Sequence, residues 1–504
     1  MAIFSKLLKE QLFFSIGAVS IISFIAGYIS KSKRNNQIAL PTNLEVKCVV
    51  SSVPRSYSLN APFSNLVTEL DISGCGIDKF PDAIGNMLSL KKINAAKNKL
   101  SSLPDSFSDL KQLEVAFFLG CEFTQIPSVL GTLQNLFMLS FKANKIHDIP
   151  EDSLSSSIGW LILSDNQISS LPHSIGRLTG LRKLMLAGNK LRRLPPSIKS
   201  CTDLELVRLA DNLLQQFPSE LLALPRLAWL ALAGNSFNSA VEREVALVQG
   251  TVDVHMDKEL GSGASGVVYT GTLSEGGGAI KGTQGEIPVA VKLYRDAKTS
   301  DGCPSDEMAT SAVAGATDCP HLMRSFGKLP REHPVSNGGM GLVLEFLEGY
   351  DVLGQPPSFQ SVTRDQYHPT RRFSLKTILG VLRSVCGAAT VLHERGITHG
   401  DMYAHNVLVK GGDNGDGFSV LSDFGASFFY KGSDSGVPIS DADKLERIEV
   451  LAFGHLMSEL LQRSDGCDVS EIKKIADSCC VLEVALRPSF SELRRKLLQD
   501  FERR

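Results

Sequence analysis

The feature that most constrains this chain of 504 residues is a short string, LxLxxNxL, which returns at a nearly constant interval. Eight residues take the asparagine position of this string: Cys75, Asn98, Cys121, Asn144, Asn166, Asn189, Asn212 and Asn235. Successive positions are 23 residues apart, except for one step of 22. A fixed period of this length indicates a solenoid, in which each repeat buries its apolar face against its neighbours.

A second string, a proline preceded by an apolar residue, lies between the copies of the first. It occurs at Pro81, Pro104, Pro127, Pro150, Pro172, Pro195 and Pro218. The two strings together resemble the leucine-rich repeat over about residues 60 to 240. Within one repeat, Leu184 and Leu186 point inward from a short strand. We expect the Asn189 amide to turn into the core and bond backbone groups of adjacent turns, which would otherwise be buried without partners.

The resemblance implies a rigid curved sheet with a concave surface that binds proteins. Several strand positions are expected to be exposed on it, either as partner contacts or as solvated side chains: Phe137, Lys183, Met185, Arg208 and Trp229. Cys75 and Cys121 are interpreted as substitutes for the asparagine, because cysteine is small and its thiol is a weak donor. The ten cysteines include no CxxC pair, which favours a reducing compartment.

The charge of the chain argues against one class of partner. Lys and Arg number 52 and Asp and Glu 54, a net charge of −2. This balance gives no reason to expect nucleic acid as the main partner.

The second half begins with a glycine-rich motif. Gly261, Gly263, Gly266 and Val268 fit GxGxxGxV, in which glycines allow backbone N–H groups to close on phosphates between two strands. Alone, this pattern is equally consistent with a plain hairpin turn. Lys292 follows within the β-branched run VAVKLY, where it can reach the α and β phosphates of a nucleotide.

Two further motifs come in the same order. The stretch ITHGDMYAHNVLV contains Asp401 and Asn406, and LSDFGAS contains Asp423. Four motifs in this order resemble the protein kinase superfamily over about residues 255 to 500. The resemblance implies a two-lobed α+β fold that binds ATP and Mg²⁺.

The resemblance also implies a role for each matching residue. Lys292 would hold the phosphates and pair with Glu307, or alternatively with its neighbour Asp306. Asp401 would orient the attacking hydroxyl and accept its proton, while Asn406 and Asp423 would hold Mg²⁺. The adenine site would be formed by Ala290, Leu344, Glu345, Leu347 and Leu408, with residues 345–347 as the hinge and the side chains of Ala290 and Leu408 on either side of the ring.

The chain departs from the kinase pattern at four places. Gly400 replaces the arginine of HRD, and Tyr403 replaces the lysine of serine/threonine kinases, so another group, such as His405, would have to neutralise the phosphoryl charge. No APE motif is found, which leaves Arg487 without its usual glutamate. The activation segment is short, so the sequence predicts neither the usual peptide docking nor control by phosphorylation of that segment.

The N-terminal residues predict a membrane anchor. Between Gln11 and Ser30 there is no charge, and residues 12–30 would form a helix of nearly the length of a bilayer core. Lys31, Lys33 and Arg34 follow at once, which favours a retained anchor over a cleaved signal and places the downstream residues on the cytosolic side. A buried core helix is the third interpretation.

The overall prediction is a multidomain chain, a leucine-rich repeat α/β solenoid followed by a two-lobed α+β kinase-like fold, with an N-terminal transmembrane helix. The expected parts are an anchor (1–34), a linker and repeat cap (35–64), the repeats (65–240), a linker helix (241–254) and the kinase domain (255–504). The expected function is a single-pass membrane protein kinase that phosphorylates Ser or Thr rather than Tyr in proteins recruited by the repeats. The alternatives are a pseudokinase scaffold and a small-molecule phosphotransferase, since HGD in place of HRD also occurs in aminoglycoside and choline kinases.

Overall fold

The computed structural model describes residues 46–49, 67–238, 245–263, 265–274, 286–295, 302–336, 338, 340–412, 415–432 and 435–499. The predicted membrane anchor, residues 12–30, lies outside these residues. The chain divides into two compact units, Met1–Leu181 and Arg182–Arg504.

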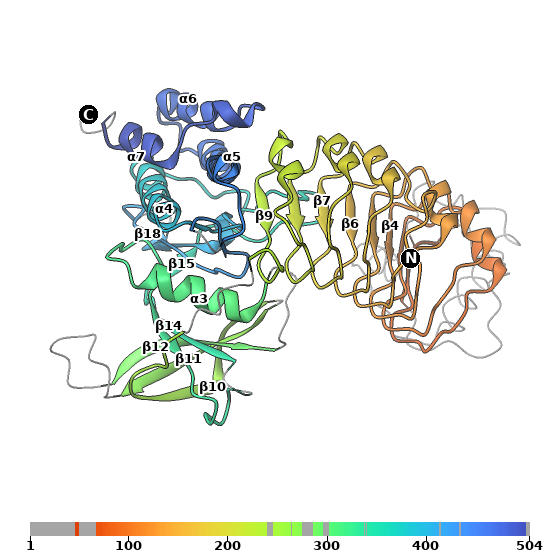
Figure 1. Ribbon diagram of the computed structural model, residues 1–504, viewed down its shortest axis with the longest axis horizontal. Coiled ribbons are helices and arrows are strands. Elements are labelled where there is room, and N and C mark those ends of the chain that lie inside the picture. The colour runs from red at the N-terminus through yellow and green to blue at the C-terminus, as the bar shows by residue number, and fades with distance from the viewer. Residues whose placement is uncertain are drawn as a thin grey trace, which may run out of the picture. The chain divides into compact units, whose positions relative to one another are not determined.

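The first unit is a stack of repeat turns on a parallel sheet (Figure 1). Its strands pair in chain order: β1 (Val46–Val49), β2 (Val67–Asp71), β3 (Lys92–Asn94), β4 (Val115–Phe117), β5 (Met138–Ser140) and β6 (Trp160–Ile162). Short 3-10 helices follow several of the strands: η2 (Asp82–Asn86), η3 (Asp105–Asp109), η4 (Ser128–Thr132) and η5 (His173–Arg177).

The asparagine ladder forms as predicted. The Asn98 amide nitrogen donates to the carbonyls of Ile72 and Ala95, both at 2.9 Å, and its oxygen accepts the N–H of Ile77 at 3.0 Å. The Cys121 thiol takes the equivalent place and lies 3.3 Å from the Ala95 carbonyl oxygen. Each side chain therefore supplies partners to backbone groups that the solenoid buries.

The second unit contains the last three repeat turns and the kinase-like region. Its first elements are β7 (Lys183–Met185), η6 (Pro196–Ser200), β8 (Leu206–Arg208), η7 (Ser219–Ala223) and β9 (Trp229–Ala231). A five-stranded sheet follows in the order β10–β11–β12–β14–β13, with α3 (Pro304–Gly315) packed on β13. Its strands are β10 (Thr251–Ser262), β11 (Gly266–Ser274), β12 (Ile287–Tyr294), β13 (Ser325–Lys328) and β14 (Gly341–Glu345).

The remainder of the second unit is mainly helical, and α3 lies between it and the sheet (Figure 1). Its helices are α4 (Leu375–Glu394), α5 (Ile439–Leu461), α6 (Ser470–Cys479) and α7 (Phe490–Gln499), with short turns η8 (Ala404–Asn406) and η10 (Val484–Leu486). Its short strands are β15 (Tyr350–Val352), β16 (Ile397–Thr398), β17 (Val407–Lys410), β18 (Ser419–Leu421) and β19 (Phe428–Phe429).

Helix α4 is the centre of this lobe. It begins at the N-cap Ser374, whose hydroxyl accepts the N–H of Thr377 at 3.1 Å. Among the described residues, α4 is the one helix long and apolar enough to span a membrane. Its apolar face packs instead in a buried cluster with residues of α5 and α7, a cluster that also includes Leu206 and Trp229 of the repeats. The core of the kinase-like lobe therefore continues into the last repeats.

Candidate active site

A buried lysine lies at the centre of the site. Lys292 Nζ, on β12, donates to Glu307 Oε1 at 2.5 Å and to Asp423 Oδ1 at 3.3 Å. Lys292 and Glu307 are 6% and 3% exposed, whereas the Asp423 side chain is half exposed. Burial disfavours the ammonium form, but the carboxylates of Asp423 and Glu307 outweigh it and hold the pKa of Lys292 above its usual value. The ammonium of Lys292 in turn holds the pKa of Asp423 below its usual value.

Local sequence explains why these groups meet. Helix α3 begins with Pro304 at its first position, which places Glu307 in the first turn and facing β12. The alternative partner, Asp306, accepts a backbone hydrogen bond from Gly234, and burial raises its pKa. Of the two acidic residues that the sequence offered, Glu307 is thus the one that contacts Lys292.

The glycine-rich turn joins β10 to β11. Gly261 pairs with Val268 on β11, and Val268 pairs with Lys292 on β12, so the glycine-rich turn and the lysine lie at the same level of the sheet. A Cβ added at Gly266 would lie 2.2 Å from the Leu293 carbonyl oxygen, so packing requires this glycine. A Cβ at Gly261 or at Gly263 would meet none of the described atoms within 4 Å, which leaves room for a phosphate to approach the backbone.

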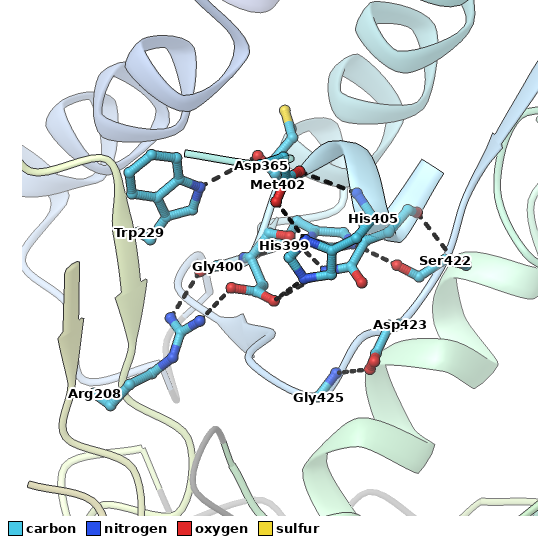
Figure 2. Close-up of polar contacts among 12 residues, drawn as sticks. Arg208, Trp229, Asp365, His399, Gly400, Met402, His405, Ser422, Asp423 and Gly425 are labelled. Carbon is cyan, nitrogen blue, oxygen red and sulfur yellow. Dashed lines mark hydrogen bonds and ion pairs between the residues drawn. The ribbon is translucent and has the colours of Figure 1, made fainter. Parts of the chain in front are cut away.

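The loop between β16 and η8 carries Asp401, and Figure 2 shows its neighbours His399, Gly400 and Met402. His399 Nε2 donates to the Ser422 carbonyl at 3.0 Å, and its ring packs against Phe424. Asn406 Nδ2 donates to both the carbonyl and Oδ2 of Asp401, at 2.8 and 2.9 Å. These bonds fix the carboxylate and join the catalytic loop to the segment that carries Asp423.

His405 is bound to an acidic residue from the segment after the hinge. Its Nδ1 lies 2.8 Å from Asp365 Oδ1, and its backbone N–H donates to Asp365 Oδ2 at 3.1 Å. Its Nε2 lies 4.0 Å from Asp401 Oδ2. Burial opposes the imidazolium, but the hydrogen bond to Asp365 and the charge of Asp401 prevail and raise the pKa of His405. Asp365 and Asp401 therefore both favour the imidazolium form of His405.

The residues predicted to contact adenine lie on both lobes. Ala290 pairs with Leu344 between β12 and β14, and the N–H of Glu345 donates to the Arg324 carbonyl at 3.0 Å. Leu347 and Leu408 are half-buried at the edge of the helical lobe's core. Their roles in adenine binding stay predictions.

The predicted Mg²⁺ ligands are a carboxylate and an amide. Because Asn406 directs its nitrogen to Asp401, its amide oxygen is left as a ligand atom. Among the described residues, His, Cys, Asp and Glu form no group of three that could hold a metal ion. A site with two protein ligands fits Mg²⁺, which usually keeps water and binds substrate phosphates.

One expectation from the sequence is wrong. Lys183, Arg208 and Trp229 were expected to be exposed on the concave face, but they are 7%, 2% and 1% exposed. Arg208 Nη1 donates to the Gly400 carbonyl at 3.1 Å, and its Nη2 forms an ion pair with Asp401 Oδ1 (Figure 2). Arg208 and Trp229 are covered by the catalytic loop of the same chain, since Trp229 Nε1 donates to the Met402 carbonyl. No motif or spacing in the sequence indicated this contact, nor that of Asp365.

The strand order of the sheet, the Lys292 to Glu307 pair and the Asp401 loop define a protein kinase domain. A family model described as protein tyrosine and serine/threonine kinase matches residues 254–435, and a leucine-rich repeat model matches residues 66–87. The chain thus contains a protein kinase domain together with leucine-rich repeats.

Among curated proteins, the chain is similar to the ephrin type-A receptor 8 of Mus musculus, with 29% identity over 198 residues, which cover 39% of this chain and 16% of the receptor. It is also similar to the ephrin type-B receptor 1 of Gallus gallus, with 28% identity over 39% of this chain and 17% of the receptor. The matches therefore span less than a fifth of these relatives. A solved leucine-rich repeat protein of Leptospira interrogans shares 29% identity over 34% of this chain and 41% of that chain, with a TM-score of 0.30.

Proposed function

We propose that this chain is an ATP-dependent protein kinase that transfers the γ-phosphoryl group to a serine or threonine hydroxyl of proteins bound by its repeats. The observation that carries the proposal is the Lys292 cation, held between Glu307 and Asp423 next to an open glycine turn. In a protein kinase, this lysine and its glutamate partner must be in place for activity.

The chain's own residues account for each part of the transfer. The turn at Gly261 and Gly263 leaves backbone N–H groups open to the phosphates, and Lys292 supplies a positive charge to them. Mg²⁺ would be held by Asn406 and Asp423, and it neutralises charge on the phosphates when bound. Asp401 accepts the proton as the acceptor oxygen bonds to the γ phosphorus and the bond from that phosphorus to the β–γ bridging oxygen of ATP breaks, releasing ADP.

A cation beside the acceptor is also available. Serine/threonine kinases have a lysine where this chain has Tyr403, and His405, whose pKa is raised by its bond to Asp365, lies two residues further on. We assign to His405 the part of stabilising the phosphoryl charge. The choice of Ser or Thr over Tyr belongs to this proposal, because the matched family includes both kinds of kinase.

The cellular placement is also part of the proposal. The uncharged stretch at residues 12–30 would anchor the chain in a membrane, and the basic residues behind it would keep the repeats and the kinase domain in the cytosol. Carbonate extraction and protease protection test this placement, and a protected kinase domain would overturn the orientation.

One observation favours a second candidate, a pseudokinase scaffold. Arg208 forms an ion pair with Asp401, and Tyr403 is buried at the position of the usual lysine. In that case the chain would bind nucleotide without transferring phosphate.

The deciding experiment measures transfer of labelled phosphate from ATP with Mg²⁺ by the full chain, to itself and to a generic protein. Asp401→Ala should abolish the signal while keeping the rise in melting temperature that nucleotide causes. Equal labelling by the variant would show that the activity comes from a contaminant. A nucleotide-induced shift without any transfer would favour the scaffold, and aminoglycosides and choline as acceptors test the small-molecule alternative.

A further inference from the structure

We propose that the concave face of the last three repeats is a docking surface for the catalytic loop of the same chain, and that Arg208 on this face closes the acceptor side of Asp401. This inference rests on the proposed kinase function. Three separate departures from the kinase pattern contact the last repeats: Gly400 and Tyr403 meet β9, and Arg487 meets the Pro225 carbonyl beside η7.

The first contact is the ion pair itself. Arg208 binds Asp401 Oδ1 and Asn406 binds Oδ2, so each oxygen already accepts one donor and a substrate hydroxyl has to compete with the Arg208 charge for Asp401. The Arg208 side chain is 3% exposed and its guanidinium also holds the Gly400 carbonyl. A guanidinium does not lose its proton in a protein, so Arg208 keeps its positive charge throughout the ordinary pH range.

The first departure, Gly400, is explained by the approach of β9. Gly400 has φ +74°, and an added Cβ would lie 2.5 Å from the Ala426 carbonyl oxygen and 2.8 Å from that of Leu230, on β9. An arginine at this position would meet both backbones. Glycine at this position is therefore the residue that lets the repeat strand reach the catalytic loop.

The second departure, Tyr403, packs against a tryptophan of the repeats. Its ring stacks on that of Trp229 with the centroids 4.3 Å apart and an interplanar angle of 4°. Trp229 Nε1 donates to the Met402 carbonyl at 3.2 Å, and the Arg364 guanidinium lies 5.2 Å from the Trp229 ring centroid. Where a lysine would face the phosphoryl group, this chain has an aromatic ring buried against the repeats.

The third departure is Arg487, which lacks its usual glutamate. It is fully buried and donates to three carbonyls, those of Val481, Arg447 and Pro225, and the last belongs to the repeats. The Nη2 to Pro225 distance is 2.6 Å. A carbonyl of the solenoid thus takes part of the role of the missing carboxylate.

The segment after the hinge strengthens the same contact. Thr363 donates to Glu205 Oε2, and Arg182 binds Glu205 Oε1 at 3.0 Å and the Thr363 hydroxyl at 2.9 Å. Two residues along, Asp365 holds His405 of the catalytic loop. Residues 363–365 therefore connect the repeats to the catalytic loop.

Other hydrogen bonds hold the last repeats against the kinase-like region without involving Asp401. The bond from Arg487 to Pro225, and that from the Ser219 hydroxyl to Asp441 Oδ2 at 2.6 Å, do not involve Asp401. Replacing Arg208 alone should hence open the acceptor side of Asp401 while the repeats stay in place. The domain would then be more active toward protein substrates.

The test compares the full chain with Arg208→Gln, which keeps length and removes charge, and with Arg208→Ala. The matched control is Arg226→Gln, because Arg226 lies on the same repeats in a surface ion pair with Asp203 and its side chain is 54% exposed. Steady-state transfer of labelled phosphate to a generic protein is measured with protein and ATP varied separately. Removing one partner of a buried pair has large effects, so we expect kcat/KM for the protein to rise roughly tenfold or more.

The KM for ATP should stay unchanged, which a general loosening of the fold would not produce. Nucleotide-induced stabilisation is measured in parallel to show that each variant is folded. If the wild type is active and both Arg208 variants transfer phosphate equally well or less well, the proposal that Arg208 closes Asp401 is overturned. Lower transfer would show instead that Arg208 supplies charge to the phosphoryl group. No transfer by any chain, although nucleotide stabilises all of them, overturns the kinase function itself and the proposal for Arg208 with it.

Discussion

Replacing Glu307 with glutamine perturbs the ion pair on which the nucleotide site depends. Glutamine keeps the volume and one acceptor but leaves the Lys292 ammonium without its buried counter-charge. Removing one partner of a buried pair costs about 3–5 kcal/mol. Asp423 still lies 3.3 Å from the ammonium, and it is half exposed, so we expect about 3 kcal/mol, the lower end of that range.

Thermal unfolding and nucleotide titration measure this effect. Because a large domain loses about 2 °C per kcal/mol, the melting temperature of the second unit should fall by about 6 °C. The ammonium is also drawn toward Asp423 instead of the phosphates, so we expect nucleotide to bind roughly tenfold more weakly, which is about 1.4 kcal/mol.

Glu348→Gln is the matched control, because Glu348 is exposed just beyond the hinge. Its melting temperature should stay close to that of the wild type, since surface substitutions change stability by about 0.5 kcal/mol or less. The reasoning would be refuted if Glu307→Gln melted with the control and bound nucleotide as tightly as the wild type.

Three further predictions concern the ladder, the histidine and the glycine. The Asn144 side chain bonds the carbonyls of Phe118 and Phe141 and the N–H of Phe123. Asn144→Ala should therefore lower the free energy of unfolding, measured with denaturant, by about 2–3 kcal/mol, and Asn144→Cys should lower it less. The folded pKa of His405 is raised, so its bond to Asp365 stabilises the fold fully below about pH 6.5, the ordinary histidine pKa, and this contribution is lost as pH rises through the folded pKa. The difference in unfolding free energy between the wild type and Asp365→Asn should therefore shrink as pH rises. A difference that stays constant with pH would contradict this. Gly400→Arg, which restores HRD, should lower stability by more than about 2 kcal/mol, because φ is +74° and two carbonyls crowd the Cβ; a stable variant would show that β9 can move away.

Some features of the site were open to prediction because local patterns carry them. The ladder positions of Cys121 and Asn144 follow from the period of the repeats. Each of these depends on residues close in sequence or repeated at a fixed interval, where geometry is set by the backbone itself.

The contacts that cover Asp401 had no such signal. Arg208 and Trp229 occupy strand positions that a solenoid normally leaves open, and their burial comes from packing against a loop far along the chain. Asp365 lies in a segment without a recognisable motif, so its bond to His405 could not be expected either.

The sequence by itself determined the two kinds of architecture and the order of the catalytic motifs, since periodic burial and short-range turns are encoded residue by residue. Only the tertiary structure decided that Glu307, not Asp306, pairs with Lys292, and that the repeats lie on Asp401. The physical reason is that such contacts depend on how whole elements pack in three dimensions, which no single stretch of residues specifies.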